Sequence, residues 1–359
     1  MNQQPYLLAL HRRLKLTRPR FEKLHAFFKG DWQKAYQASF KDWIAAQIDK
    51  PGLEKFFSHS ETISPSQEYD LLQDSGAKLV TCLQEPYPDL WHHIAQAPAL
   101  FFYKGSGENL NQKSVAVVGA RKMTNYGERA LASLLRPVFE KKITVVSGLA
   151  YGTDAAAHKL ALKCQAPTIA VLGNGIDSVY PKQNSSLAAQ ILEAGGTLVS
   201  EYLPHTQARP EYFPERNRLV AGLAQATVVL EGALKSGSLI TARAANDFGR
   251  SVWAVPGDVF QANSAGCNEL IFQGEATPLT QAQYLLENLK LDNAITLHEI
   301  NLSDEEKELV KKLRRQSEWW IDDFLAESKQ AMPEIMASLV QLELKGVLKF
   351  TDNKVFALI

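Results

Sequence analysis

The chain has 359 residues, 45% of them hydrophobic, and its 39 Lys and Arg match its 39 Asp and Glu in number. This length and composition predict a globular protein of about two or three domains. The formal net charge of zero excludes attraction of an acidic partner by a global positive field, so such a partner must meet local clusters of Lys and Arg.

Cysteine spacing and hydropathy indicate the compartment. Cys82, Cys164 and Cys267 are far apart and show no C-x-x-C spacing, which argues against a zinc site or a disulfide framework and favours a reducing cytosol. The N-terminus lacks the apolar run of a signal peptide, and no stretch approaches the roughly 20 apolar residues of a membrane span. We therefore expect a soluble, cytoplasmic protein without a membrane partner.

Residues 1–63 predict a small helical domain. Apolar residues recur three and four positions apart from Tyr6 to about Phe57, which indicates several short amphipathic helices. The first half of this segment is strongly basic, because Glu22 is its only acid before Gly30. The basic residues there are Arg12, Arg13, Lys15, Arg18, Arg20, Lys23 and Lys29.

Residues 64–290 predict a parallel-sheet domain. Lys78–Leu83 and Ala99–Tyr103 lead into it as strands. From Ser114 onward, β-branched apolar runs alternate with helical stretches, a pattern typical of an α/β fold with helices on both faces of a parallel sheet. The runs are Val115–Val118, Ile143–Val146, Thr168–Leu172, Thr197–Val199, Thr227–Leu230 and Val252–Val255.

Residues 303–359, after a predicted linker at 291–302, have the pattern of a winged-helix domain. The predicted elements are a helix with a capping-box start at Ser303–Glu306, helices at Trp319–Ala326 and Met332–Lys345, and a hairpin of Val347–Phe350 with Val355–Leu358. Ten acids and seven Lys or Arg lie between the start of the first helix and the end of the third. This acidic balance favours protein contact at least as much as DNA contact.

A small residue ends each predicted strand. In an open parallel sheet, ligands bind outside the carboxyl ends of the strands. The sequence therefore predicts the binding site at that edge of the sheet. The residues concerned are Gly119, Ser147–Gly148, Gly173, Ser200, Gly232 and Pro256–Gly257.

Two glycine-rich loops at this edge suggest nucleotide chemistry. Gly173–Ser178 is close to a G-x-G-x-x-G fingerprint, but it lacks the third glycine, and Tyr180-Pro181 delays the next helix to about Asn184, which disfavours a dinucleotide site. Gly232–Ser238 has the glycine spacing of a P-loop without its Lys, which disfavours ATP hydrolysis. Ser236, Gly237 and Ser238 instead place N–H groups and hydroxyls at a helix N-terminus, as an anion site requires.

Ser147, Asp154 and His158 lie close together in the sequence, as hydrolase residues sometimes do. Ser147 has no G-x-S-x-G elbow around it, so a nucleophilic role has little support. Asp154 is better interpreted as the N-cap of the helix that contains His158, because its side chain can accept from the first free N–H groups.

Residues 118–274 resemble the DNA-processing protein A family, also called DprA or Smf. Two departures, Thr153 where Ile is expected and Gly232 where Ala is usual, remove no charge. The matching motifs are Val118–Arg121, Ser147–Asp154 with Ala157-His158, Val171–Asp177 with Tyr180–Lys182 and Asn184, Ser200-Glu201, Phe213–Arg218 with Ala221-Gly222, Ser236–Ala242, Gly249-Arg250, Ala254–Gly257 and Gly266–Asn268.

The resemblance implies an extended Rossmann-like core between a helical domain, similar to sterile-alpha-motif or helix-hairpin-helix units, and a winged helix. It implies a non-catalytic protein without a cofactor that binds single-stranded DNA and protects incoming strands during natural transformation. It further implies loading of the recombinase RecA, with displacement of single-strand-binding protein, and a homodimer formed through the Rossmann-like core.

The predicted DNA-binding residues lie at the strand ends, where cations and N–H donors can follow a phosphate chain. Arg121 suits a bidentate phosphate contact, and one of Arg216 and Arg218 is expected to pair internally with Glu201 or Glu231. No aromatic platform is evident near these loops, which predicts a steep salt dependence. The full set is Gly119, Arg121, Lys122, Ser147, Gly148, Lys182, Asn184, Arg216, Arg218, Ser236, Gly237 and Ser238.

Two other functions stay open, a dinucleotide-binding protein and a nucleotide phosphoribohydrolase. The second resembles the lysine-decarboxylase-like family with its P-G-G-x-G-T-x-x-E signature, but Ala244 stands where the catalytic Glu is needed. A third hypothesis adds to DNA binding rather than replacing it: the basic segment before Gly30 also contacts DNA.

Overall fold

The computed structural model describes residues 2–58, 63–94 and 96–291, and beyond these 303, 306, 309–310, 319–320, 332–344, 348–351 and 354–357. The chain divides into two compact units, Met1–Leu286 and Glu287–Ile359. Within the described residues, no helix is both long enough and apolar enough to cross a membrane.

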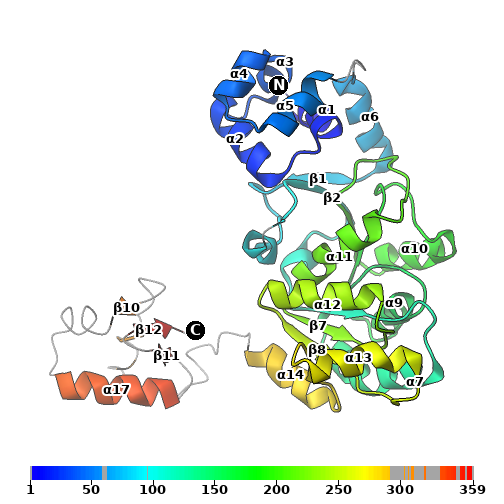
Figure 1. Cartoon of the computed structure of the whole chain (residues 1–359), viewed down its shortest axis with the longest axis vertical. Helices are drawn as coiled ribbons and strands as arrows, with labels where there is room; N and C mark the ends of the chain where they lie inside the picture. The colour runs from blue at the N-terminus through cyan, green and yellow to red at the C-terminus, as the bar shows by residue number, and fades with distance from the viewer. Residues whose placement is uncertain are drawn as a thin grey trace. The chain divides into compact units, whose positions relative to one another are not determined.

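Short helices form the first part of the larger unit (Figure 1). Leu7, Leu10 and Leu14 recur along one face of the first helix and are buried, as their spacing predicts. Trp43 is also buried, and its ring lies 4.0 Å from that of Phe56, measured between centroids. The helices are α1 (Gln4–Leu14), α2 (Arg18–Phe28), α3 (Trp32–Gln37), α4 (Phe40–Ala45), α5 (Lys50–Ser58) and α6 (Pro65–Ser75).

A nine-stranded sheet forms the core of this unit, in the order β1-β2-β6-β5-β4-β3-β7-β8-β9. The strands from β3 to β9 pair in parallel, whereas β2 pairs antiparallel with both β1 and β6. The predicted mixed α/β fold with a mostly parallel sheet is therefore confirmed. The strands are β1 (Lys78–Thr81), β2 (Leu100–Gly105), β3 (Ser114–Val118), β4 (Thr144–Ser147), β5 (Thr168–Val171), β6 (Thr197–Ser200), β7 (Ala226–Val229), β8 (Ser251–Ala254) and β9 (Thr277–Pro278).

Helices cover the central strands, every residue of which is buried from β3 to β7. Helix α9 packs with α8 and α10. Helix α11 packs against α12 over the sheet. Right-handed crossovers that run in opposite directions along a sheet place their helices on opposite faces. The helices are α7 (Asn125–Ala130), α8 (Arg136–Glu140), α9 (Thr153–Lys163), α10 (Ser185–Glu193), α11 (Tyr212–Gly222), α12 (Gly237–Asp247), α13 (Ala262–Phe272) and α14 (Ala282–Leu291).

The second unit contains α17 (Met332–Leu344) and an antiparallel sheet in the order β10-β12-β11. The strands are β10 (Trp319–Trp320), β11 (Leu348–Thr351) and β12 (Lys354–Ala357), so the predicted hairpin is present. The expectation that a helix begins at Trp319 is wrong, because these two aromatic residues pair with β12.

The capping box predicted at the start of the first helix of residues 303–359 is present. The Ser303 N–H donates to Glu306 at 2.7 Å, and the Glu306 N–H donates back to the Ser303 hydroxyl at 3.2 Å. Most of the predicted linker and large parts of the first two predicted helices lie outside the described residues. The winged helix as a whole therefore stays a prediction.

Candidate functional site

The strand order reverses between β3 and β7. From β3 the chain runs outward through β4, β5 and β6, whereas from β7 it runs the other way through β8 and β9. The loops at such a point diverge and leave a crevice outside the carboxyl ends of the strands. A pocket of about 420 Å³, here called the switch-point pocket, lies there. Of the predicted site residues it brings together Gly119, Arg121, Lys122, Arg216, Ser236, Gly237 and Ser238.

Three exposed cations line the switch-point pocket. Arg121 and Lys122 follow β3, and Lys235 precedes α12. None of the three forms an ion pair with any residue that the structure describes. The sequence analysis missed Lys235, although its place inside the Gly232–Ser238 loop was a usable signal. Positive charge without a protein partner favours an anionic ligand.

The N-terminus of α12 opens into the same pocket. Ser236 is the N-cap, and its hydroxyl accepts from the Ser238 N–H at 3.3 Å. Gly237 is exposed, and a Cβ added there would meet only one atom, the Asn217 amide nitrogen at 4.0 Å. The backbone is therefore open to close approach, and the helix dipole favours an anion at this end.

Aromatic rings border the pocket, which the sequence analysis did not anticipate. Phe213 lines the wall, and the Arg121 guanidinium lies 5.9 Å from its ring centroid. The ring of Tyr180, which is 51% exposed, lies 5.3 Å from that of Phe213. The signal was present in the sequence, because both residues belong to the motifs shared with the DprA family. Only the fold shows that they are neighbours.

The profile of one family, DNA recombination-mediator protein A, matches residues 78–290, which is more than half of the chain. The chain belongs to this family. Protein Smf of Escherichia coli K12 is 35% identical over 77% of this chain and 76% of its own length. The X-ray structure of DNA processing protein A from Streptococcus pneumoniae aligns with a TM-score of 0.67 and 32% identity, over 80% of this chain and 98% of that one.

A structure of DNA processing protein A from Helicobacter pylori, reported for its single-stranded DNA binding mode, aligns with a TM-score of 0.54. The sequences are 28% identical, and the alignment covers 61% of this chain and 98% of that one. The resemblance to the DprA and Smf proteins, inferred from the motifs, is thereby confirmed.

In this DNA recombination-mediator protein A family member, Arg216 lies beneath the pocket and is only 4% exposed. It donates to the carbonyl oxygens of Gly148, at 2.6 Å, and Val171. A Cβ on Gly148 would come within 2.5 Å of the guanidinium, so this glycine makes room for Arg216. The expectation that Arg216 and Gly148 face a phosphate is therefore corrected, because the Arg216 guanidinium and the Gly148 carbonyl are bonded to each other inside the protein.

Asp154 is buried beside Arg216. Its carboxylate accepts from the backbone N–H groups of Gly148, at 3.1 Å, and Ala150, at 3.3 Å. Burial raises the pKa of Asp154, while Arg216 and the two N–H groups oppose that rise. The expectation that Asp154 is the N-cap is wrong: Gly152 is the N-cap, and Asp154 reaches back to satisfy the loop before α9.

Ser147 and Asn184 are structural in this family member. The Ser147 hydroxyl is buried and donates to the Val117 carbonyl at 2.7 Å, and the Asn184 amide donates to Leu149 at 2.8 Å. These side-chain donors are bonded within the protein, and neither residue lines the switch-point pocket, contrary to the expectation that they meet the ligand there. His158 is also buried, contacts the Thr168 hydroxyl at 2.7 Å, and has its pKa lowered to about 3, mainly by burial.

Arg218 and Lys182 lie outside the lining of the switch-point pocket. Arg218 forms an ion pair with Glu201. This pair confirms the prediction that either Arg216 or Arg218 pairs internally with Glu201 or Glu231. Lys182 is exposed at the start of the short 3-10 helix Lys182–Asn184, directly before α10. As expected, α10 begins just after Asn184.

Proposed function

We propose that this protein binds single-stranded DNA, without catalysing a reaction, at the carboxyl edge of its sheet. The observation that carries the proposal is the set of exposed cations Arg121, Lys122 and Lys235, which have no ion pair among the described residues, around the open N-terminus of α12. Phosphates bind well to this combination of cations and N–H donors. The single-stranded DNA binding mode of the Helicobacter pylori relative supports the same conclusion.

The strand runs with its phosphates toward these cations and toward Ser236–Ser238. Bases stack on the Phe213 and Tyr180 rings, because an aromatic face accepts any base and so gives binding without sequence preference. Gly119 and Lys182 border the path. Affinity thus has two sources, phosphate contacts that weaken with salt and stacking that does not.

The side chains available in the pocket favour binding over turnover. Among the described residues that line it, Asp154 is the one with a carboxylate, and this carboxylate already accepts from two backbone N–H groups. Ser147 and His158 are buried and make separate hydrogen bonds, so they do not form a nucleophile with its base. The protein therefore holds its ligand by positive charge, backbone N–H groups and aromatic rings, and it uses no cofactor.

The family resemblance extends the proposal to the cell. There the protein protects incoming strands during natural transformation and loads RecA, displacing single-strand-binding protein. It acts in the cytoplasm as a homodimer through the Rossmann-like core. Apolar side chains on and before α13 support a protein contact, since Val259, Phe260 and Phe272 are 77%, 92% and 82% exposed.

The domain division in this proposal is residues 1–63, 64–290 and 303–359, with a linker at 291–302. The last domain is a winged helix, and its acidic balance favours contact with a protein partner at least as much as with DNA.

Fluorescence anisotropy with a labelled oligothymidine tests the proposal on the full chain. Arg121→Gln and Lys235→Gln each remove one positive charge from the pocket, and each is expected to weaken binding. Lys141→Gln is the matched control, because Lys141 is exposed where α8 ends, before the amino end of β4. If all three variants bind like the unchanged protein, the strand does not occupy the switch-point pocket.

A further inference from the structure

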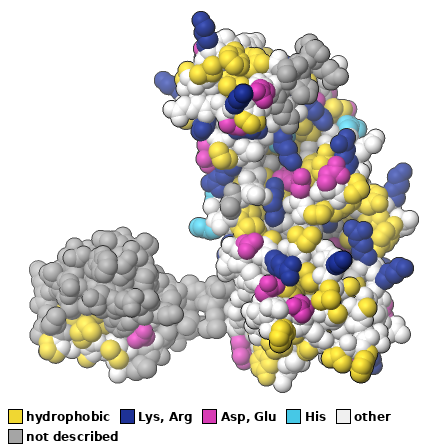
Figure 2. All heavy atoms as spheres, viewed as in Figure 1, with side chains coloured by type: hydrophobic (Ala, Val, Ile, Leu, Met, Phe, Trp, Pro, Cys, Tyr) yellow, Lys and Arg dark blue, Asp and Glu magenta, His cyan; other side chains and the backbone are white. Residues whose placement is uncertain are grey.

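A second hollow, of about 1070 Å³, lies between the N-terminal helices and the antiparallel side of the sheet. We call it the inter-helix cleft. One wall is the end of α1 with the turn into α2, the second is residues 96–100 at the start of β2, and the third is the segment from Glu201 to Arg218. Figure 2 shows Lys and Arg side chains over this part of the molecule.

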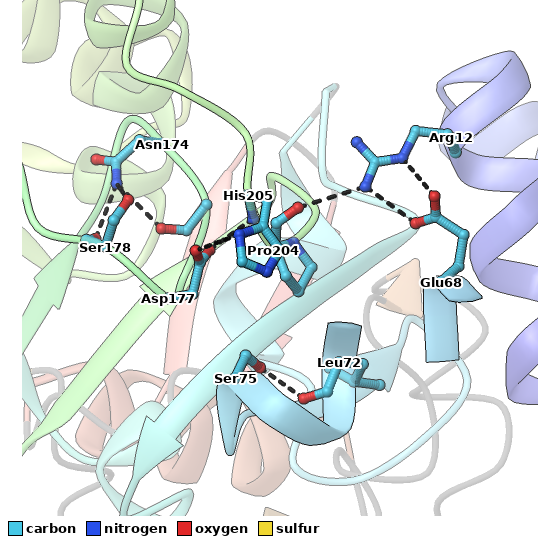
Figure 3. A network of polar contacts seen from close by, with 10 residues as sticks. Arg12, Glu68, Leu72, Ser75, Asn174, Asp177, Ser178, Pro204 and His205 are labelled. Carbon is cyan, nitrogen blue, oxygen red and sulfur yellow. Dashed lines mark hydrogen bonds and ion pairs between the residues drawn. The ribbon is translucent and has the colours of Figure 1, made fainter. Parts of the chain in front are cut away.

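Polar contacts fix the walls of the cleft (Figure 3). Arg12 on α1 makes two hydrogen bonds, of 2.8 and 3.0 Å, to Glu68 on α6, and a third of 3.3 Å to the Pro204 carbonyl. On the other side of the same loop, the His205 N–H donates to Asp177 at 2.7 Å. The loop that leads into α11 is therefore held by both the helices and the sheet domain.

The cleft adjoins the switch-point pocket at the start of α11. Pro214, in the first turn of α11, lines both hollows. Its neighbours Tyr212 and Phe213 line the cleft and the pocket, respectively. A polymer that leaves the pocket over the start of α11 therefore reaches the neighbouring cleft within a short distance.

The mouth of the cleft offers exchangeable cations beside an aromatic ring. Lys15 is 58% exposed and pairs at 3.1 Å with Glu215, which is 44% exposed. Such a surface pair contributes little, so a phosphate can take the place of Glu215. Arg209 is exposed, has no ion pair with the described residues, and lies 5.9 Å from the ring centroid of Tyr212. That ring stacks on Tyr202 at 4.4 Å.

Two buried polar atoms beside the cleft have no hydrogen-bond partner among the described residues. They are Oε1 of Glu201, which is 9% exposed, and Nη1 of Arg218. Both residues line the cleft, and their other atoms pair with each other. A buried polar atom without a partner is destabilising. A ligand that brings a donor to Glu201 and an acceptor to Arg218 would therefore be stabilised at this wall of the cleft. A nucleobase edge carries such a pair.

We infer that the inter-helix cleft is a second segment of the single-stranded DNA path, in which Lys15 and Arg209 hold phosphates and Tyr212 supports a base. The inference rests on the proposed function of the switch-point pocket, because the strand reaches the cleft from there. It gives the N-terminal helices a direct part in DNA binding.

Binding of a short and a long oligothymidine to the full chain tests the inference. Single-strand sites span about 4 to 16 nucleotides, so oligomers of about 4 and about 16 nucleotides probe the pocket alone and both segments together. The double variant Lys15→Gln/Arg209→Gln is expected to bind the short oligomer like the unchanged protein. It should bind the long one several-fold more weakly, with a salt slope shallower by about 1.4, because each lost phosphate contact changes it by about 0.7.

The matched control is Lys141→Gln/Lys163→Gln, which removes the same charge from exposed residues at the other edge of the sheet. Thermal melting checks that both double variants are folded. Equal binding of the long oligomer by the cleft variant and the unchanged protein overturns the inference.

Arg121→Gln separates this outcome from a failure of the proposed function. If Arg121→Gln weakens both oligomers while the cleft variant weakens neither, the pocket binds DNA and the cleft does not. If Arg121→Gln changes nothing while the cleft variant weakens the long oligomer, the pocket assignment fails and the cleft binds DNA by itself. That last result contradicts the continuous path.

Discussion

The guanidinium of Arg216 donates a hydrogen bond of 2.6 Å to the carbonyl oxygen of Gly148, and so joins α11 to the carboxyl end of β4. The same nitrogen also reaches Val171 at the end of β5. One buried cation therefore fixes two strand ends at the edge where the site lies.

Replacing Arg216 is expected to destabilise the fold rather than only weaken DNA binding. Arg216→Ala leaves Asp154 buried without its cation, together with two unpaired carbonyl groups. Leaving a buried carbonyl group without a hydrogen-bond partner costs about 1 to 3 kcal/mol for each group. Urea unfolding followed by circular dichroism measures the loss. The control is Arg243→Ala, which breaks the exposed pair with Glu275 and should cost about 0 to 1 kcal/mol. Equal stability of the two variants would contradict the assigned role.

Gly152→Ala should disturb the loop that carries Arg121. Gly152 has a φ of +69°, and a Cβ there would lie 2.3 Å from the Ala120 carbonyl oxygen and 2.6 Å from that of Arg121. Both strain and collision therefore act on the backbone beside the pocket. We expect lower stability together with weaker oligothymidine binding, measured by thermal melting and anisotropy.

Gly195→Ala is the matched control for this glycine. It also has a positive φ, of +78°, but nothing lies within 4 Å of an added Cβ. It should therefore lose only about 1 to 2 kcal/mol of backbone energy and bind DNA normally. Weakened DNA binding by the control variant would show that the loop collision is not the cause.

Stability should fall as the pH falls below 6.5, because of His158. Burial, with a smaller contribution from Arg216, lowers its pKa from 6.5 to about 3. The unfolded chain therefore takes up the proton first, and the folded state loses stability between pH 6.5 and 3, approaching about 1.4 kcal/mol per pH unit. Urea unfolding at several pH values between about 5 and 7 measures this slope.

The variant His158→Gln isolates that contribution, since other titrating groups are common to both proteins. Its stability should depend less steeply on pH in this window. The same slope in both proteins would mean that His158 keeps an ordinary pKa in the folded state.

The sequence predicted the parallel sheet, its binding edge and two of the three exposed pocket cations, Arg121 and Lys122, because these follow from local patterns, whereas Lys235 was missed. The strand runs ending in Gly119 and Gly232 predict both the parallel sheet and its binding edge. It could not separate Arg216 from Arg121, since both follow apolar or aromatic motifs and differ only in burial. Hydrogen bonds from Arg216 to Gly148 and Val171 join residues far apart in the sequence, and no local pattern encodes them. The pairing of Tyr180 with Phe213 was missed for the same reason.

Phe213 and Arg121 are expected to contribute to DNA binding in distinguishable ways. Phe213→Leu keeps an apolar side chain but removes the stacking face, which should weaken oligothymidine binding by about 1 to 3 kcal/mol. Because no charge changes, the slope of log affinity against log salt should stay the same. Arg121→Gln should instead make that slope shallower by about 0.7. Anisotropy titrations over a range of salt concentrations measure both quantities, with Lys141→Gln as the control that should change neither. A shallower slope for Phe213→Leu would show that the ring acts by positioning the Arg121 guanidinium, which lies over it, and not by stacking on a base.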